Sequence, residues 1–454
     1  MGTVGISFGS ATSGQGFDVA STVTQIQASE QAIETPWKNQ LTALQAQDTV
    51  LSTLGSDLAA LTTSLQALTD FQGVFAAKLG SSSNTNVLNL TSASSTAVAG
   101  SHTIEITQLA QTSSNASTAV SAANDTLSGT LTIQNHPFTV DSLNNNNTMS
   151  TLSAAINAAN IGVTASVITD SSGSRLSIVS GTSGAAGQLT ISASLTDASS
   201  NQVTFPSTSG QAGQDANLKV DGVSVTSPSN TVTTVIPGIT FQLLALSTTP
   251  VQVQITDDTT SIGTAMSSFV SAYNKVIGDF NTQETKNSGG SPPPLLGSPV
   301  LAQLQGALTG SLFTGAASGS INNITQLGIS MNNDGTLTLN ADTLNSALNS
   351  NLANVTGFLQ NSGSFGQAMT TTLNNLGTQA PNGSIYLAQQ QNAAQEKALS
   401  ADISNEDTLL SAQKTQLTNE LNTANQILQS IPSQLNQVNE LYSAITGYNQ
   451  NPTG

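Results

Sequence analysis

Apolar residues recur every seven positions at both ends of this chain, and this repeat limits what the chain can fold into. Near the N-terminus the repeat runs from Val19 to Leu68, and near the C-terminus it runs from Ile403 to Ile445. A period that averages 3.5 residues keeps one apolar row facing a single neighbour along the whole helix. Such a row needs a partner helix. The two rows therefore predict an antiparallel coiled-coil stalk in which both ends of the chain pair.

The apolar residues of the two repeats form the candidate interaction surface, which we call the terminal seams. The N-terminal seam contains Val23, Ile26, Ile33, Leu44, Leu51, Leu54, Leu58 and Leu61. The C-terminal seam contains Leu417, Leu421, Leu428, Ile431, Leu435, Val438 and Ile445. The alternative is an ordinary core helix at each end. Helices in compact domains usually run about 8–20 residues, and these repeats are longer.

Two prolines are expected to interrupt these helices. Proline is tolerated in the first turn of a helix but removes a hydrogen bond from its interior. Pro36 therefore predicts a break near Thr35 and a new helix that runs to about Asp70. Pro432 lies inside the C-terminal repeat, and we expect it to kink or divide that helix.

The composition excludes several classes of function. Charged residues make up 7% of the 454 residues, and the net charge is −17. Eight Lys and Arg residues without a cluster cannot form the basic patch that binds nucleic acid or an anionic membrane. The absence of cysteine excludes disulfides and thiolate metal sites. No apolar run of about 18 residues could span a bilayer. Residues 1–15 are rich in Gly, Ser and Thr, which favours a flexible start without a secretory signal peptide.

The middle of the chain changes to a period of two residues after Gly80. Strands are predicted through residues 111–249, with a short helix at 149–159 and one strand at 188–192. Asp221-Gly222 is a typical two-residue hairpin turn. Helices return at Ile262.

Helices at both ends and strands in the middle predict an α+β multidomain protein whose domains are nested. The expected domains are a coiled-coil leg of residues 1–35 and 415–454, a leg domain of helices and hairpins at 36–110 and 250–414, and a β-rich head at 111–249 with a subdomain at about 130–200. An inserted domain of this kind has its two boundaries close together in space.

Residues that could carry catalysis are few. His102 and His136 are the only histidines, and neither has a carboxylate at metal-ligand spacing, so we expect both to be solvated. Asp257 and Asp258 would point to opposite faces of a strand, and capping the helix at Ile262 is the favoured role. No phosphate-binding loop, nucleophile elbow or triad is present. The sequence therefore predicts neither an enzyme nor a cofactor site.

Six motifs in order carry a family resemblance. They lie at residues 16–19, 100–110, 149–179, 215–240, 269–274 and 327–337. The most specific part combines Val220-Asp221-Gly222-Val223 with Val235-Ile236-Pro237-Gly238. Together they resemble the family of the flagellar filament cap protein, also called flagellar hook-associated protein 2.

This resemblance implies a structural protein at the distal tip of the bacterial flagellum. It implies a homo-oligomeric ring of about five or six subunits that promotes folding and polymerisation of exported flagellin and prevents its leakage. The implied partners are flagellin, hook–filament junction proteins and an export chaperone at the C-terminus. Export would use the flagellar type III route without a cleaved signal peptide. The resemblance implies no cofactor.

Two other non-enzymatic functions compete with this one. An extracellular adhesin could bind host or surface glycans through the head, but glycan sites usually expose aromatic residues and aromatics make up 4% of this chain. Another flagellar junction or filament subunit could have similarly paired termini. The motif at residues 215–240 favours the cap over that subunit.

Overall fold

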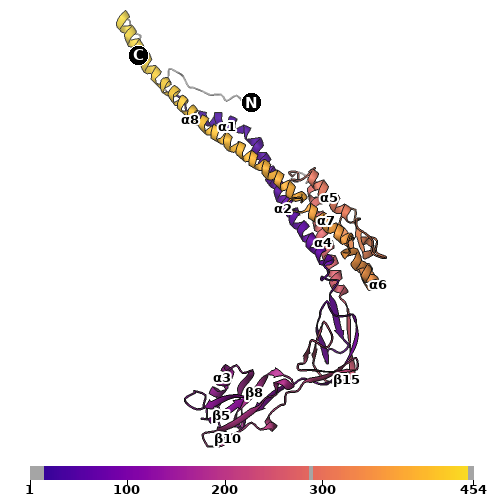
Figure 1. Ribbon diagram of the computed structural model, residues 1–454. Coiled ribbons are helices and arrows are strands. Elements are labelled where there is room, and N and C mark those ends of the chain that lie inside the picture. Colours follow the sequence, from indigo (N-terminus) through magenta and orange to yellow (C-terminus); the bar gives the residue numbers. More distant parts are fainter. Residues whose placement is uncertain (1–14, 286–289, 448–454) are drawn as a thin grey trace. The chain divides into compact units, whose positions relative to one another are not determined.

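The computed structural model describes residues 15–285 and 290–447 (Figure 1). The expected flexible segment before Gln15 and the last seven residues lie outside the described part. The chain forms two compact units. A helical unit combines the residues up to Thr69 with those from Met266 onward, and a strand unit comprises Asp70–Ala265.

The helical unit contains the long helices that the two sequence repeats predict. Its elements are α1 (Val19–Glu30), the 3-10 helix η1 (Gln31–Ile33), α2 (Thr35–Thr69), most of α4 (Thr259–Glu284), α5 (Pro299–Ser311), η4 (Ile324–Leu327), β16 (Ile329–Met331), β17 (Leu337–Leu339), α6 (Ala341–Gln360), α7 (Phe365–Leu376) and α8 (Ser384–Thr446). Helices α1 and α2 both contact α8 (Figure 1).

The two prolines behave differently. Pro36 lies in the first turn of α2, after the helical path breaks at η1, which confirms the predicted interruption. Pro432 lies inside α8, and the helix continues to Thr446, so Pro432 does not divide the helix, and the kink expected as the alternative stays a prediction. A proline removes one backbone hydrogen bond and crowds the carbonyl four residues earlier, but the hydrogen bonds on either side keep this helix continuous.

Leucines of α2 form one side of the core of the helical unit. Leu54, Leu58 and Leu61 are at most 1% exposed. On α4 the large side chains Tyr273 and Phe280 are fully buried. The core therefore uses the apolar faces that the helical period predicts in both helices.

The strand unit contains two separate cores. The first lies between a five-stranded sheet, β1-β15-β3-β11-β12, and a three-stranded sheet, β13-β14-β2. Their bounds are β1 (Lys78–Ser82), β2 (Leu88–Ala93), β3 (Gly100–Gln108), β11 (Ala216–Val220), β12 (Val223–Ser227), β13 (Thr231–Val232), β14 (Ile239–Leu243) and β15 (Ser247–Asp257). All pairs are antiparallel.

The second core lies under a short helix, α3 (Met149–Ala158), and is also made by two sheets, β10-β9-β5-β6 and β4-β8-β7. The strands are β4 (Thr112–Ala116), β5 (Ser128–Ile133), β6 (His136–Val140), β7 (Val163–Asp170), β8 (Gly173–Ser183), β9 (Ile191–Thr196) and β10 (Gln202–Val203). The expected helix is confirmed. The strand expected at 188–192 begins later, because a 3-10 turn, η2 (Ala185–Gly187), precedes it.

The first core joins segments that are distant in the sequence. Residues of 88–110 and of 216–255 pack together in it. The nested boundaries expected at 110/111 and 249/250 fall within this set of residues, and they remain a prediction. In the described part of the chain, no helix is both long and apolar enough to cross a membrane.

Candidate functional site

The two ends of the chain pair in antiparallel fashion. The amide N–H of Phe17 donates to Asn425 Oδ1 at 2.9 Å, and Asn392 Nδ2 donates to Asp48 Oδ1 at 2.8 Å. Residue numbers rise along α1 and α2 while those of their partners fall along α8. This order confirms the antiparallel stalk predicted from the two repeats.

A buried amide fixes the register between these bonds. Gln27 is 9% exposed, and its Nε2 donates to the carbonyl oxygen of Leu410 at 2.8 Å. A buried polar side chain costs free energy unless it is hydrogen-bonded, so a sliding of α1 along α8 would leave this amide unpaired. The apolar repeat alone does not reveal this residue.

The start of α1 is defined by its cap and by a close approach to α8. The Asp18 carboxylate accepts from the N–H of Ser21 at 3.0 Å, which satisfies a free donor of the first turn. Before it, Gly16 has a φ of +65°, and a Cβ there would lie 2.2 Å from Asn425 Oδ1. Only glycine fits this position without moving Asn425.

Most of the N-terminal seam is buried. Val23, Leu44, Leu51, Leu54, Leu58 and Leu61 are all buried. Ile26 is half-buried, and Ile33 is 57% exposed. The exposure of Ile33 differs from the expectation because η1 replaces the α-helix there and turns the residue out of the row.

The C-terminal seam is covered only in its first half. Leu417, Leu421, Leu428 and Ile431 are half-buried. Farther along α8, Leu435 is 43%, Val438 61% and Ile445 75% exposed. Among the described residues, Gly16 and Phe17, just before α1, lie beside Asn425, and the distal part of α8 continues past them.

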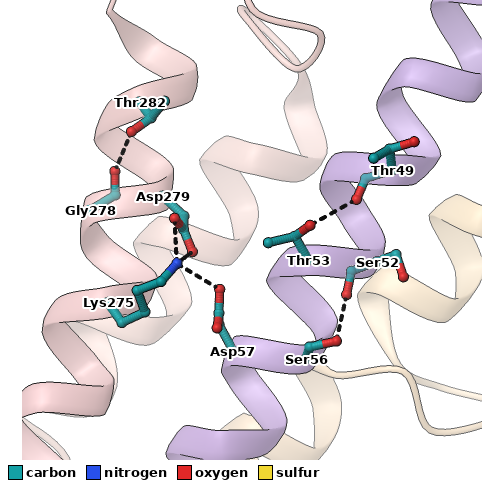
Figure 2. Close-up of polar contacts among 9 residues, drawn as sticks. All are labelled: Thr49, Ser52, Thr53, Ser56, Asp57, Lys275, Gly278, Asp279 and Thr282. Atoms are coloured by element: carbon teal, nitrogen blue, oxygen red, sulfur yellow. Dashed lines mark hydrogen bonds and ion pairs between the residues drawn. The ribbon is translucent and has the colours of Figure 1, made fainter.

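An ion-pair cluster links α2 to α4 (Figure 2). Lys275 Nζ lies 3.1 Å from Asp57 Oδ2 and 2.7 Å from Asp279 Oδ2. A hydrogen bond with Asp279, and then Lys275, lowers the pKa of Asp57. Burial, and then Asp57, raises the pKa of Asp279. Asp57 and Lys275 lie 218 residues apart in the sequence, so the sequence alone could not reveal this cluster.

Hydroxyl groups on the exposed helix faces bond to their own backbone. Figure 2 shows Thr53 Oγ1 donating to the carbonyl of Thr49 at 3.1 Å and Ser56 Oγ donating to that of Ser52 at 3.0 Å. The same i−4 bond recurs along α8, for example from Thr415. These bonds give the long helices a polar surface without charge.

A buried carboxylate lies at the joint between α1 and α2. The side chain of Glu34 is 1% exposed, and its Oε2 lies 2.5 Å from Lys38 Nζ. The hydrogen bond with Glu34 raises the pKa of Lys38. A buried charge needs such a partner, and this pair joins two residues one helical turn apart where α2 begins.

The strand unit contains a paired histidine that we expected to be solvated. His102 Nδ1 lies 2.6 Å from Asp221 Oδ2, and the N–H of Thr103 donates to Asp221 Oδ1 at 2.8 Å. His102 lowers the pKa of Asp221. The hairpin turn brings Asp221 back to β3, which explains why sequence spacing missed the pair.

The paired carboxylates at the end of β15 are structural. Asp258 caps α4 by accepting from the N–H of Ser261 at 3.0 Å, as expected, while Asp257 pairs with Lys78 on β1. Within residues 15–285 and 290–447, no three His, Asp or Glu residues gather as metal ligands.

Comparisons with known proteins agree on one family. The family models "Flagellar hook-associated protein 2 N-terminus" and "Flagellar hook-associated protein 2 C-terminus" match residues 15–113 and 213–433. The flagellar hook-associated protein 2 of Escherichia coli K12 is 29% identical over 80% of this chain and 82% of its own length. The B-type protein of Pseudomonas aeruginosa PAO1 is 31% identical over 70% and 74%.

One solved structure extends this agreement to the fold. The D1-D2-D3 domains of the flagellar cap protein FliD from Escherichia coli superpose with a TM-score of 0.57 at 28% identity. The match covers 76% of this chain and 99% of that one.

Proposed function

Because this chain belongs to the flagellar hook-associated protein 2 family, whose members cap the flagellar filament, we propose that its terminal seams form the leg by which the cap holds the filament end. The observation that carries this proposal is the distal half of α8. Val438 and Ile445 are more than half exposed there, although they continue the row that is covered nearer α2. An apolar row of this kind is a surface for another protein.

The proposed partners are other copies of the chain and flagellin. About five or six subunits would form a ring, in keeping with closed rotational symmetry. Flagellin would arrive unfolded and fold beneath this ring, and the ring would stop it from leaking. Junction proteins between hook and filament, and an export chaperone at the C-terminus, complete the proposed set. The subunit itself would be exported by the flagellar type III route without a cleaved signal peptide.

The uncharged surface of the helices suits a cap that must move as the filament grows. Apolar contacts are non-directional, so exchanging one apolar contact for a neighbouring one costs little free energy. A paired charge would instead fix one position. The leg surface of distal α8 carries only Glu440 as a charged residue among residues 427–446.

The nested domain scheme supports a division of labour within the subunit. Residues 1–35 with 415–454 would contact the filament end, and residues 36–110 with 250–414 would support them. The head at residues 111–249 would form the plate of the ring. The separate core of α3 and its two sheets supports the subdomain at about 130–200.

A truncation tests the role of the leg. Deleting residues 428–454 should leave both compact units folded, because the cores lie elsewhere. In a strain that lacks its own cap protein, the truncated gene should give short filaments and monomeric flagellin in the medium. Filament length and secreted flagellin are the readouts. Normal filaments and swimming would contradict the capping role of these residues.

Two single substitutions sharpen this test. Val438→Asp places a charge on the seam, and Gln437→Asp places the same charge on the next, exposed position. The first should reproduce the leakage of flagellin, and the second should not. Equal leakage from both variants would assign the defect to added charge rather than to the seam.

A further inference from the structure

A groove in the helical unit lies where α2, α8 and the loop before α5 come together. Its volume is about 540 Å³, which is typical of sites that hold a ligand. Leu44 and Leu51 of α2 line it together with Leu295 and Val300, so its floor is aliphatic. Of the residues that the structure describes, those that line the groove include none with a charge. The groove therefore suits an uncharged ligand that carries apolar groups.

The rim of the groove carries carboxamides that are available to a ligand. Gln40 and Gln47 line it from α2, and Gln391 and Gln395 line it from α8. No hydrogen bond joins these four side chains to another group of the described chain. Each carboxamide offers both donors and an acceptor. Carboxamides on two sides of a groove can pair with the N–H and C=O groups of a peptide backbone.

The loop that forms one wall of the groove is held in place by the protein itself. The N–H of Leu295 donates to Oε1 of Gln283, a side chain of α4 that is 9% exposed, at 3.3 Å. The N–H of Ser298 donates to the carbonyl oxygen of Leu295 at 2.9 Å, and Gly297 between them has a φ of +73°. This tight turn leads directly into α5. A wall that is already ordered lowers the entropy cost of binding.

The sequence before Gln15 has the chemistry that matches this groove. In Val4-Gly5-Ile6-Ser7-Phe8, apolar side chains alternate with small ones. An extended chain points such apolar side chains to one side. Five extended residues cover about 16 Å, which is also about the length of α2 from Gln40 to Leu51. Residues 1–14 contain no charged side chain, as the uncharged groove requires.

The other two segments outside the described part lack this chemistry. Residues 286–289 include Lys286, and residues 448–454 contain no aliphatic side chain. Of the three segments, Val4–Phe8 is therefore the one that fits the groove.

The segment cannot reach the groove of its own chain. Gly16 lies beside Asn425, and the nearest lining residue of α8 is Gln395. The helix between Asn425 and Gln395 is about 45 Å long. The chain from Gly16 back to Ile6 spans at most about 36 Å, even when fully extended. Only a second copy can place Ile6 in the groove.

We propose that residues 4–8 of one copy bind in extended form in this groove of a neighbouring copy. The apolar side chains contact the aliphatic floor, and the backbone pairs with the carboxamides of the rim. Peptide-binding grooves commonly combine these two kinds of contact. This inference rests on the proposed ring, because the ring brings neighbouring copies together.

A labelled synthetic peptide of residues 2–12 tests the groove in the full chain. The host chain carries Ile6→Ser, so that its own segments do not compete. Fluorescence anisotropy should show saturable binding. Ala43→Phe fills the groove and should weaken binding at least tenfold, whereas Ala393→Phe, on an exposed position of α8 that does not line the groove, should leave it unchanged. No saturable binding, or equal binding to both variants, would overturn the proposal.

Two altered peptides test which residues the groove recognises. The peptide with Ile6→Ser should bind at least tenfold more weakly than the natural peptide, because it loses the central apolar contact. The peptide with Ser7→Ala should bind with unchanged affinity, since position 7 points away from the floor. Similar affinities of the two altered peptides would contradict the alternation on which the proposal depends.

Photocross-linking in the full chain tests whether a second copy supplies the segment. One chain carries the photoreactive p-benzoylphenylalanine in place of Phe8, and it is mixed with isotope-labelled wild-type chain. Mass spectrometry should find cross-links to labelled peptides that contain Leu44, Leu51 or Leu295. Cross-links confined to the same chain, or to labelled peptides outside the groove, would contradict the proposal.

These outcomes are separate from the capping assay. If the chain without residues 428–454 gives normal filaments while the peptide binds, the capping role of the leg falls and the groove assignment stands. If that chain leaks flagellin while the peptide does not bind, the capping role stands and the groove assignment falls.

Discussion

At the scale of single residues, buried leucines and a few buried polar groups hold the helical unit together. Leu58 is 1% exposed within the row that faces the other helices. Full burial of such a side chain contributes about 2–3 kcal/mol. Gln27 adds register rather than net stability, because a shift of α1 along α8 would remove its single partner, the carbonyl of Leu410.

Replacing Leu58 by Asp should destabilise the helical unit strongly. The new carboxylate would be buried without a partner, at a cost of roughly 3–5 kcal/mol. Ala59→Asp is the matched control, since it adds the same charge at the next, exposed position. We expect the control to cost less than about 1 kcal/mol. Thermal melts followed at 222 nm measure both, and similar melts would show that Leu58 does not belong to the core.

Lys275 should control how stability depends on pH. In Lys275→Met, Asp57 and Asp279 would face each other without a cation, and their pKa values in the folded state would rise. A raised folded pKa gives stability that is present at low pH and lost as the pH rises through that pKa. The variant should therefore be about 1 kcal/mol less stable than wild type at pH 7, with a smaller difference near pH 4.

Urea unfolding at several pH values checks this expectation. Lys414→Met removes the same charge from an exposed position of α8 and should show no such dependence. A constant difference between Lys275→Met and wild type from pH 4 to 7 would mean that the two carboxyls do not interact.

At the scale of elements, the sheets of the strand unit depend on segments far apart in the sequence. β3 lies between β15 and β11, and β1 forms the edge beside β15. Removing residues before position 111 would delete β1, β2 and β3 and expose the apolar side of β11. The unit of Asp70–Ala265 contains all of these strands.

Two fragments should therefore behave differently. Residues 70–265, expressed alone, should give a soluble β-rich domain with a cooperative melt. Residues 111–249 should retain the core under α3 but lose the five-stranded sheet, with a lower β content per residue. Circular dichroism and calorimetry compare them. Equal cooperativity in the shorter fragment would support the nested boundary at residue 111.

The sequence predicts elements better than contacts. Local signals were sufficient for α2, α3 and the hairpin of β11 and β12, because helix periodicity and the Asp-Gly turn act over a few residues. The sequence did not reveal α7, whose apolar residues follow α6 after a short turn. The pairs Asp57–Lys275 and His102–Asp221 depend on tertiary folding. No local pattern could have identified them.

At the scale of the whole molecule, the small number of charged residues determines how the folded protein responds to acid. At about pH 2 the carboxylates are neutral, and the only charged side chains are eight Lys and Arg residues and two His. Acid unfolding is driven by protonation of paired carboxylates and by repulsion among the remaining cations. Both contributions are small in a chain with 7% charged residues.

The protein should consequently remain folded in acid. Carboxylates with lowered pKa values, such as those of Asp221 and Asp258, lose their stabilising contribution as the pH falls through those values. We expect a lower melting temperature at pH 2.5 than at pH 7, but a cooperative melt at both, with little effect of 1 M NaCl. Loss of cooperative melting at pH 2.5 would contradict this.

The pairing of the two chain ends also sets an order in time. The hydrogen bond between Phe17 and Asn425 cannot form until Asn425 has emerged, 408 residues after Phe17, whether the chain leaves a ribosome or a narrow channel. The strands of Asp70–Ala265 need no residue from beyond their own unit for their sheets, so they can form while the rest of the chain is still emerging. The stalk is then the last part to form, because its helices can pair fully only after Asn425 has emerged.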